Sequence, residues 1–166
     1  MSRTDVGTTV TPTIVQAGSA ANTVPGSGSF AVDVRARTVT EQQRVDRAMQ
    51  SLRPALPWAT LDIDGGPNRP PMEASSSAGL YARICALAAR LDMPEPRSVA
   101  VGGASDGNFT AGVGTPTLDG LGAIGGGAHA DDEHVVIDEL PGRTHLLTAF
   151  VRDLVGGEAR SDHAHA

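Results

Sequence analysis

Residues 102–133 read GGASDGNFTAGVGTPTLDGLGAIGGGAHADDE, and this stretch decides how the rest of the chain is interpreted. It follows a short apolar run at 98–101 that is typical of a strand, and a short helix is expected near Phe109. A Gly-rich turn between a strand and a helix directs backbone N–H groups towards a ligand. The stretch therefore predicts an α/β unit with a candidate binding turn.

The flanking segments alternate between helix and strand patterns. Apolar residues at helical spacing predict helices over 78–91 and 139–154, and a further strand is expected at 117–121. Such alternation is typical of a layered α/β unit with a parallel sheet. Because a sheet of two strands cannot cover both of its faces, we expect this unit to be incomplete.

The N-terminal part has a different order of elements. β-branched residues predict strands at 7–16 and 30–35, a helix capped by Thr40 should run to about residue 52, and a short strand follows at 59–63. This order is similar to a split β-α-β (ferredoxin-like) fold that lacks its opening strand and helix. The first lobe is therefore also expected to be incomplete.

A linker with the sequence DGGPNRPP, at 64–71, separates these two lobes. We therefore predict one domain over 7–63 and a second over 64–157. The remaining residues, 158–166, are predicted to form a disordered tail.

Charge and composition exclude several classes of function. The formal net charge is −6 and no basic stripe occurs, which argues against a nucleic-acid-binding protein. The single cysteine, Cys85, excludes an internal disulfide and a thiolate zinc cluster. No apolar run has the length of a transmembrane helix and no signal-peptide pattern occurs, so we expect no membrane association and a cytoplasmic location.

Two groups of residues in residues 102–133 could carry chemistry. Ser105 and Asp106 stand at the cap position of the short helix, with Gly107 and Asn108 just inside it, and ordinary helix capping is the simpler alternative. His129 lies in a Gly-rich loop beside three acidic residues and could bind a metal through its neutral imidazole. One histidine does not complete a zinc site, and a solvated loop histidine is the alternative.

Taken together, GGASDGNF (102–109), LDGLG (118–122) and GGGAHADDEHV (125–135) resemble the end of the catalytic domain in a family of di-zinc metallopeptidases. This family includes aminoacylases, glutamate carboxypeptidases, acetylornithine deacetylases and succinyl-diaminopimelate desuccinylases. The resemblance implies that His129 is a zinc ligand.

Two upstream segments occur in the family's order as well. The stretch AGSAANTVPGSGSFAVDVR resembles part of the family's lid domain, and NRPPME resembles the hinge that returns to the catalytic domain. The matching positions are Asn22, Pro25, Arg35 and Arg69. The resemblance thus implies part of a lid and dimerisation domain over 7–63, and the C-terminal part of a truncated catalytic lobe over 64–157.

The family hydrolyses amide bonds next to a free carboxylate. Arginine suits that carboxylate, because its guanidinium forms two parallel hydrogen bonds and stays charged. The resemblance implies that Arg35, and then Arg69, hold the carboxylate, with Asn22 reaching the site, in some members across a dimer. The alternatives are a surface ion pair with Asp33 for Arg35 and a turn before Pro25 for Asn22.

The Gly-rich turn is implied to line the substrate side of the site. Its backbone N–H groups would lie near the bond to be cleaved. The turn residues assigned to substrate binding are Gly103, Ser105, Asp106, Gly107 and Asn108.

The rest of the family's catalytic machinery belongs to an N-terminal half: a His-x-Asp motif, a bridging aspartate, a Glu-Glu pair and one more acidic ligand. We expect these groups to be encoded elsewhere, and no adjacent Glu-Glu pair occurs in this chain. A two-metal hydrolytic site needs both metals and a base. We therefore predict no catalytic residue here, a single ligand for two zinc ions, and no activity of the chain alone.

Two interpretations stay open. In the first, the chain is the C-terminal portion of a zinc-dependent amidohydrolase that acts on a small carboxylate substrate and pairs with a missing N-terminal half. In the second, it is a non-catalytic dimerisation or anion-binding remnant of such an enzyme. A homodimer formed through the lid domain is compatible with both.

Overall fold

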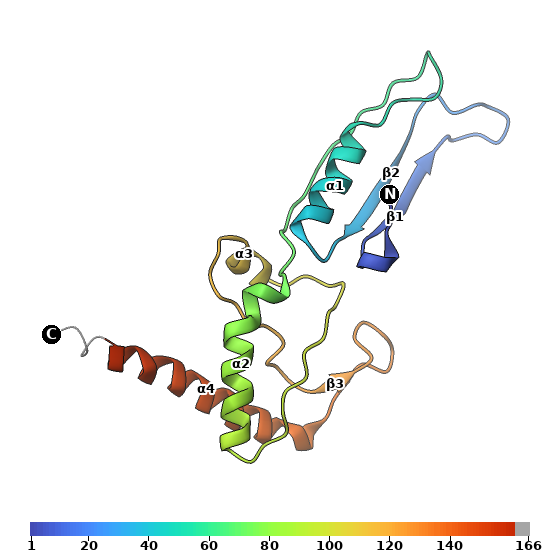
Figure 1. The fold of residues 1–166 in the computed structure, drawn as a ribbon. Helices are drawn as coiled ribbons and strands as arrows, with labels where there is room; N and C mark the ends of the chain where they lie inside the picture. The colour runs from blue at the N-terminus through green and yellow to red at the C-terminus, as the bar shows by residue number, and fades with distance from the viewer. Residues whose placement is uncertain (162–166) are drawn as a thin grey trace. The chain divides into compact units, whose positions relative to one another are not determined.

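The structure, a computed structural model, describes residues 1–161, and it describes the side chains of residues 1–156. The chain forms two compact units (Figure 1). Unit 1 contains Met1–Ala74 and Ala100–Thr115, and unit 2 contains Ser75–Val99 and the residues from Pro116 onward. The Gly-rich turn thus belongs to the same unit as the N-terminal lobe.

Unit 1 is built on an antiparallel hairpin of β1 (Thr9–Ala17) and β2 (Gly28–Arg35). These strands confirm the two predicted from β-branched residues. The register shifts between Pro12 and Val15, where a bulge places an extra residue in β1. Proline fits this position because it has no N–H to donate to a ladder.

The helix α1 (Val39–Gln50) lies along one face of this hairpin (Figure 1). Its cap is Thr38, whose hydroxyl accepts the Glu41 N–H at 3.2 Å. The predicted cap at Thr40 was therefore wrong by two residues. Both threonines stand three residues before a Glu or Gln, Thr38 before Glu41 and Thr40 before Gln43, so the capping pattern alone does not separate them. In the structure Glu41 is drawn towards Thr8 and Arg3, and the helix begins at Val39.

A buried carboxylate ties the N-terminus of the chain to α1. Glu41 accepts hydrogen bonds from the hydroxyl of the fully buried Thr8 at 2.8 Å, from Arg44 at 2.8 and 2.9 Å, and from Arg3 at 3.2 Å. The hydrogen bonds from Arg44, then that from Thr8, lower the pKa of Glu41 to about 2. The short 3₁₀ helix η1 (Thr4–Val6) is held in place by the same contacts.

Unit 2 is built on α2 (Ala74–Arg90) and α4 (Leu140–Ser161). Its core lies where the two helices meet, and the buried residues are Ile84, Leu87 and Ala88 from α2 with Leu146 and Phe150 from α4. The Arg83 guanidinium pairs with Asp153 at 2.6 Å beside this core and fixes α2 against α4. These helices confirm the two expected from apolar spacing, although α2 begins four residues earlier and α4 ends later.

Three predicted strands, at 59–63, 98–101 and 117–121, are absent from the part of the chain that the structure describes. These segments are extended or irregular and have no strand partner. A strand needs neighbours for its backbone hydrogen bonds, and an apolar run alone does not supply them. Instead, the second sheet pairs the two-residue strands β3 (Gly125–Gly126) and β4 (His134–Val135).

The mixed helix and strand content is that of an α/β chain, whereas the expected parallel sheet is not formed by residues 1–161, whose two sheets are both antiparallel. Segment 100–115 belongs to the same compact unit as the N-terminal lobe. Of the predicted disordered tail, residues 158–161 end α4, and 162–166 lie outside the described residues.

Candidate functional site

The Gly-rich turn leads into α3 (Gly107–Gly112), and its own side chains hold it in shape. The Ser105 N–H donates to Oδ1 of Asn108 at 2.9 Å, and the Gly107 N–H donates to the Ser105 hydroxyl at 3.1 Å. The Asn108 N–H donates to the Ser105 carbonyl at 3.2 Å. Three N–H groups assigned to the substrate side are therefore bonded within the turn.

The two remaining turn residues that were assigned to substrate, Gly103 and Asp106, are solvent-exposed. Asp106 stands at the predicted N-cap position, but its side chain forms no capping hydrogen bond with α3. Its carboxylate is 98% exposed and lies 3.9 Å from the guanidinium of Arg69. Asp106 therefore adds a negative charge to the open side of the turn.

The Arg35 side chain, at the end of β2, reaches the start of this turn. A methyl group built at Gly102 would lie 3.2 Å from Nη1 of Arg35, so the two residues are in contact. Nε of Arg35 donates to Asp33 at 2.8 Å, and both side chains are about half exposed. Arg35 thus forms the surface ion pair considered as its alternative and also lies beside the Gly-rich turn.

The Arg69 side chain lies against the other end of the same turn. Its guanidinium carbon is 4.9 Å from the centre of the Phe109 ring, within the range of a cation–π contact. Its Nη1 atom is 3.9 Å from the Asp106 carboxylate. Arg35 and Arg69, which are far apart in the sequence, are therefore both placed on the turn at 102–109.

Within a single chain, Asn22 lies far from Arg35. Thr9 pairs with Arg35 at one end of the hairpin, and Ala17 pairs with Gly28 at the other, where the loop carrying Asn22 begins. At about 3.3 Å per residue, the strand from Gly28 to Arg35 spans roughly 23 Å. Asn22 and Arg35 therefore occupy opposite ends of the hairpin.

His129 belongs to unit 2, in the exposed loop between β3 and β4. Its backbone is left-handed, with φ of 65°, and so is that of Gly127, with φ of 67°. The Ala130 N–H donates to the Gly127 carbonyl at 2.8 Å, and the His129 N–H lies 3.4 Å from the Glu133 carboxylate. These bonds form a tight loop that presents the imidazole of His129 at the surface.

The donor set in residues 1–161 does not by itself fit a zinc centre. Zinc takes three or four ligands, and no group of three His, Cys, Asp or Glu side chains comes together in this part of the chain. His129, Ala130 and Asp131 do have the His-x-Asp spacing, which the sequence interpretation treated as lying elsewhere, but this triplet gathers no third ligand. At most, His129 contributes one imidazole to a larger site.

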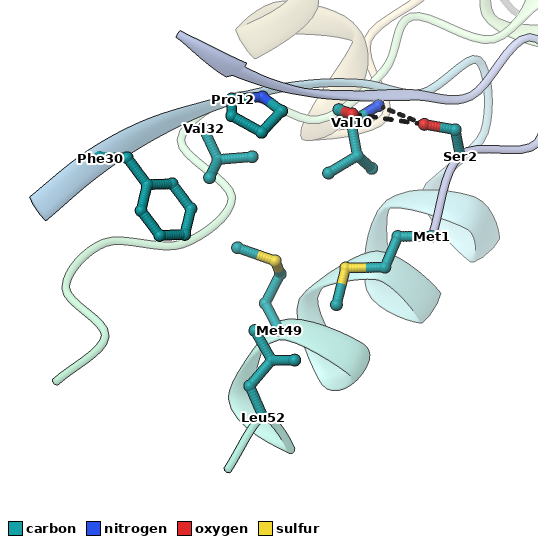
Figure 2. Close-up of a pocket in the computed structure, with 8 residues that line it drawn as sticks. All are labelled: Met1, Ser2, Val10, Pro12, Phe30, Val32, Met49 and Leu52. Carbon is teal, nitrogen blue, oxygen red and sulfur yellow. Dashed lines mark hydrogen bonds between the residues drawn. The ribbon is translucent and has the colours of Figure 1, made fainter. Parts of the chain in front are cut away.

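A separate hollow of about 270 Å³ lies between the hairpin and the end of α1 (Figure 2). Its walls are almost entirely apolar, and the one polar side chain, that of Ser2, is hydrogen-bonded to the backbone of Val10. None of the side chains that line the hollow is charged. The Gly-rich turn is therefore the better candidate site.

The sequence interpretation did not include three residues that join the turn to the hinge. Phe109 supplies the ring under Arg69, Pro70 accepts a hydrogen bond from Asn108 at 2.9 Å, and Gln42 donates to the Arg69 carbonyl at 2.5 Å. Phe109 was noted only as part of a short helix. Because Phe109 directly follows Asn108 in the predicted binding turn, its position in the sequence could have indicated a role in this site.

The model of peptidase family M20/M25/M40 matches residues 3–153. Carboxypeptidase G2 from Pseudomonas sp. (strain RS-16) is 28% identical over 153 residues, which are 88% of this chain and 36% of that protein. The chain thus spans about a third of the length of this relative. Among the helices described, none combines the length and apolarity needed to cross a membrane.

Proposed function

Because this chain belongs to peptidase family M20/M25/M40, we propose that it is the C-terminal portion of a zinc-dependent amidohydrolase or peptidase. The bond cleaved would be an amide next to a free carboxylate, as in an N-acyl amino acid or a C-terminal glutamate. The name of the similar Carboxypeptidase G2 supports a carboxypeptidase-type reaction. We place the protein in the cytoplasm, as its composition led us to expect.

One observation carries the proposal: two guanidinium groups lie on one Gly-rich turn. Arg35 contacts Gly102 at the start of the turn, and Arg69 lies over Phe109 at its end. These two cations beside exposed backbone would attract a substrate carboxylate, which would compete with Asp33 for Arg35 and with Asp106 for Arg69. In this proposal Arg35 forms the main contact and Arg69 the second, while Gly103 leaves the backbone open to the substrate.

The catalytic step itself would depend on groups that these residues do not provide. His129 would be one zinc ligand, and zinc would supply a Lewis acid and an activated water once the site is complete. The general base and the other ligands would come from an N-terminal half of the enzyme. We therefore propose that the chain alone is inactive.

A reconstitution experiment tests the proposal. The chain is mixed with a polypeptide that carries the family's N-terminal zinc ligands and Glu-Glu pair, and zinc-dependent hydrolysis of an N-acyl amino acid is measured. We expect activity only in the mixture, and we expect His129→Ala to abolish it. His134→Ala, in the adjacent strand β4, is the matched control and should retain activity. Hydrolysis that survives His129→Ala would refute the assignment of the zinc ligand.

A second candidate function is anion binding and dimerisation without catalysis. Arg35, Arg69 and the turn all belong to unit 1, whereas His129 belongs to unit 2, so a carboxylate could bind unit 1 without a metal. The position of Asn22 at the far end of the hairpin favours a homodimer, in which Asn22 of one copy reaches the turn of the other. Glutarate binding with unchanged affinity after zinc removal, combined with failed reconstitution, would favour this function.

A further inference from the structure

The Asn108 side chain bridges the Gly-rich turn and the hinge at residues 69–71. Its Oδ1 atom accepts the Ser105 N–H at 2.9 Å, and its Nδ2 atom donates to the Pro70 carbonyl at 2.9 Å. Asn108 is partly buried, and each end of its side-chain amide is hydrogen-bonded to protein backbone. A side chain that is bonded at both ends is poorly suited to contact a substrate directly.

Two further contacts join the same segments. The Arg69 guanidinium lies over the Phe109 ring. Gly112, at the end of α3, is so close to the Pro70 ring that a Cβ at this position would overlap it. Hinge and turn are therefore in contact at residues 108, 109 and 112, which fixes their relative position more firmly than any single bond.

The hinge is in turn connected to α1. Gln42, in the first turn of α1, donates from its side-chain amide to the Arg69 carbonyl at 2.5 Å. Pro70 and Pro71 follow, and the proline ring holds φ near −65°, so the hinge backbone has little freedom to absorb a displacement. A movement of α1 would therefore be passed through Arg69 and Pro70 to Asn108.

We propose that Asn108 is a positioning residue that couples the hinge at 69–71 to the Gly-rich turn. This inference rests on the proposed function, because the turn matters only if it binds a carboxylate. Asn108 would hold the Ser105 end of the turn in the shape that keeps Arg35 beside its start and Arg69 beside its end. The substrate-binding role assigned to Asn108 from the sequence is replaced by an indirect one.

Two substitutions separate the two ends of the bridge. Asn108→Ala removes both hydrogen bonds, whereas Asn108→Asp keeps an acceptor for the Ser105 N–H and loses the donor to the Pro70 carbonyl. Asn68→Asp, at an exposed position beside the hinge, introduces the same charge and is the matched control. Circular dichroism of each variant checks that the helices are retained.

Three quantities are measured by NMR on the full chain: the exchange rate of the Ser105 amide, the position of the Gln42 side-chain amide resonances, and the Kd for glutarate. We expect Asn108→Ala to speed Ser105 exchange about fivefold, which corresponds to one net hydrogen bond, and to weaken glutarate binding to a similar extent. Asn108→Asp should leave Ser105 exchange within about twofold of wild type, given the retained acceptor, but shift the Gln42 resonances. Asn68→Asp should change none of these.

Unshifted Gln42 resonances in both Asn108 variants would overturn the coupling, and so would unchanged Ser105 exchange in Asn108→Ala. Unchanged glutarate affinity in Asn108→Ala would show that the coupling does not position the site. If wild type itself fails to bind glutarate, the proposed function fails, while the exchange rates and resonances still decide whether Asn108 couples hinge to turn.

Discussion

The substitution Ile84→Ala should strongly destabilise unit 2. Ile84 is 1% exposed and belongs to a core in which five residues with described side chains are buried. The change removes three carbons, each worth about 0.8 kcal/mol of burial, and the remaining cavity raises the total to about 2–5 kcal/mol. This is a large part of the 5–15 kcal/mol that typically stabilises a domain.

Urea unfolding followed by circular dichroism at 222 nm measures this effect. The signal reports mainly on unit 2, because α2 and α4 have 17 and 22 residues whereas α1 and α3 have 12 and 6. With an m-value of about 1–2 kcal/mol/M, a loss of about 3 kcal/mol lowers the midpoint by about 1.5–3 M.

The matched control is Val151→Ala in α4, which truncates an aliphatic side chain that is 50% exposed. Its effect should stay within about 0.5 kcal/mol, as for most surface changes. If Ile84→Ala and Val151→Ala unfold at the same urea concentration, α2 and α4 do not form the core described here.

Three further predictions concern unit 1 and the loop of His129. The pKa of Glu41 is lowered from 4.5 to about 2, so its carboxylate stabilises the fold fully above pH 4.5, and this contribution is lost as the pH falls towards 2. In urea unfolding followed by the Val45 methyl resonances, the free energy of unfolding of wild type should exceed that of Glu41→Gln at neutral pH but not near pH 2. An equal difference at every pH would contradict this prediction. Gly112→Leu should separate the hinge from α3, because a side chain at this position would overlap the Pro70 ring. Nuclear Overhauser effects between α3 and Pro70 should then be lost, and their persistence would show that Gly112 does not lie against Pro70. Gly127→Ala should speed hydrogen exchange of the Ala130 amide, because alanine is strained at φ of 67° and its Cβ would lie 2.7 Å from the Asp132 carboxylate. The control Gly122→Ala, at a position with open space around it, should leave this rate unchanged. Equal rates in the two variants would contradict the loop conformation described here.

Helices and the hairpin could be predicted from the sequence because their signals are local. The apolar spacing of Ile84 and Leu87 on α2 marks the face that is buried, and the alternation of Phe30, Val32 and Val34 marks β2. Both patterns reflect periodicities that the backbone geometry fixes.

The strands predicted at 59–63, 98–101 and 117–121 failed for the opposite reason. A strand is stabilised by its neighbours, and an apolar run does not reveal whether a neighbour is present. The helix cap shows the same limit at smaller scale, since Thr38 and Thr40 both stand three residues before a Glu or Gln, and the contacts of Glu41 with Thr8 and Arg3 are tertiary.

For the candidate site, sequence resemblance pointed to Arg35 and Arg69 but not to the residues that they contact. The contacts of Arg69 with Phe109, and of Asn108 with Pro70, join residues 38–40 positions apart. Such pairs arise from the tertiary fold and leave no periodic trace in a single sequence. The same holds for Gly112: only its contact with the Pro70 ring explains why a residue without a side chain is needed there.

Zinc analysis of the purified chain, together with an assay for hydrolysis of N-acyl amino acids, tests the central claim most directly. We predict fewer than one bound zinc ion per chain and no turnover, because a single imidazole from His129 cannot hold two metals. Two tightly bound zinc ions per chain, or cleavage of the amide by this polypeptide unaided, would contradict the account.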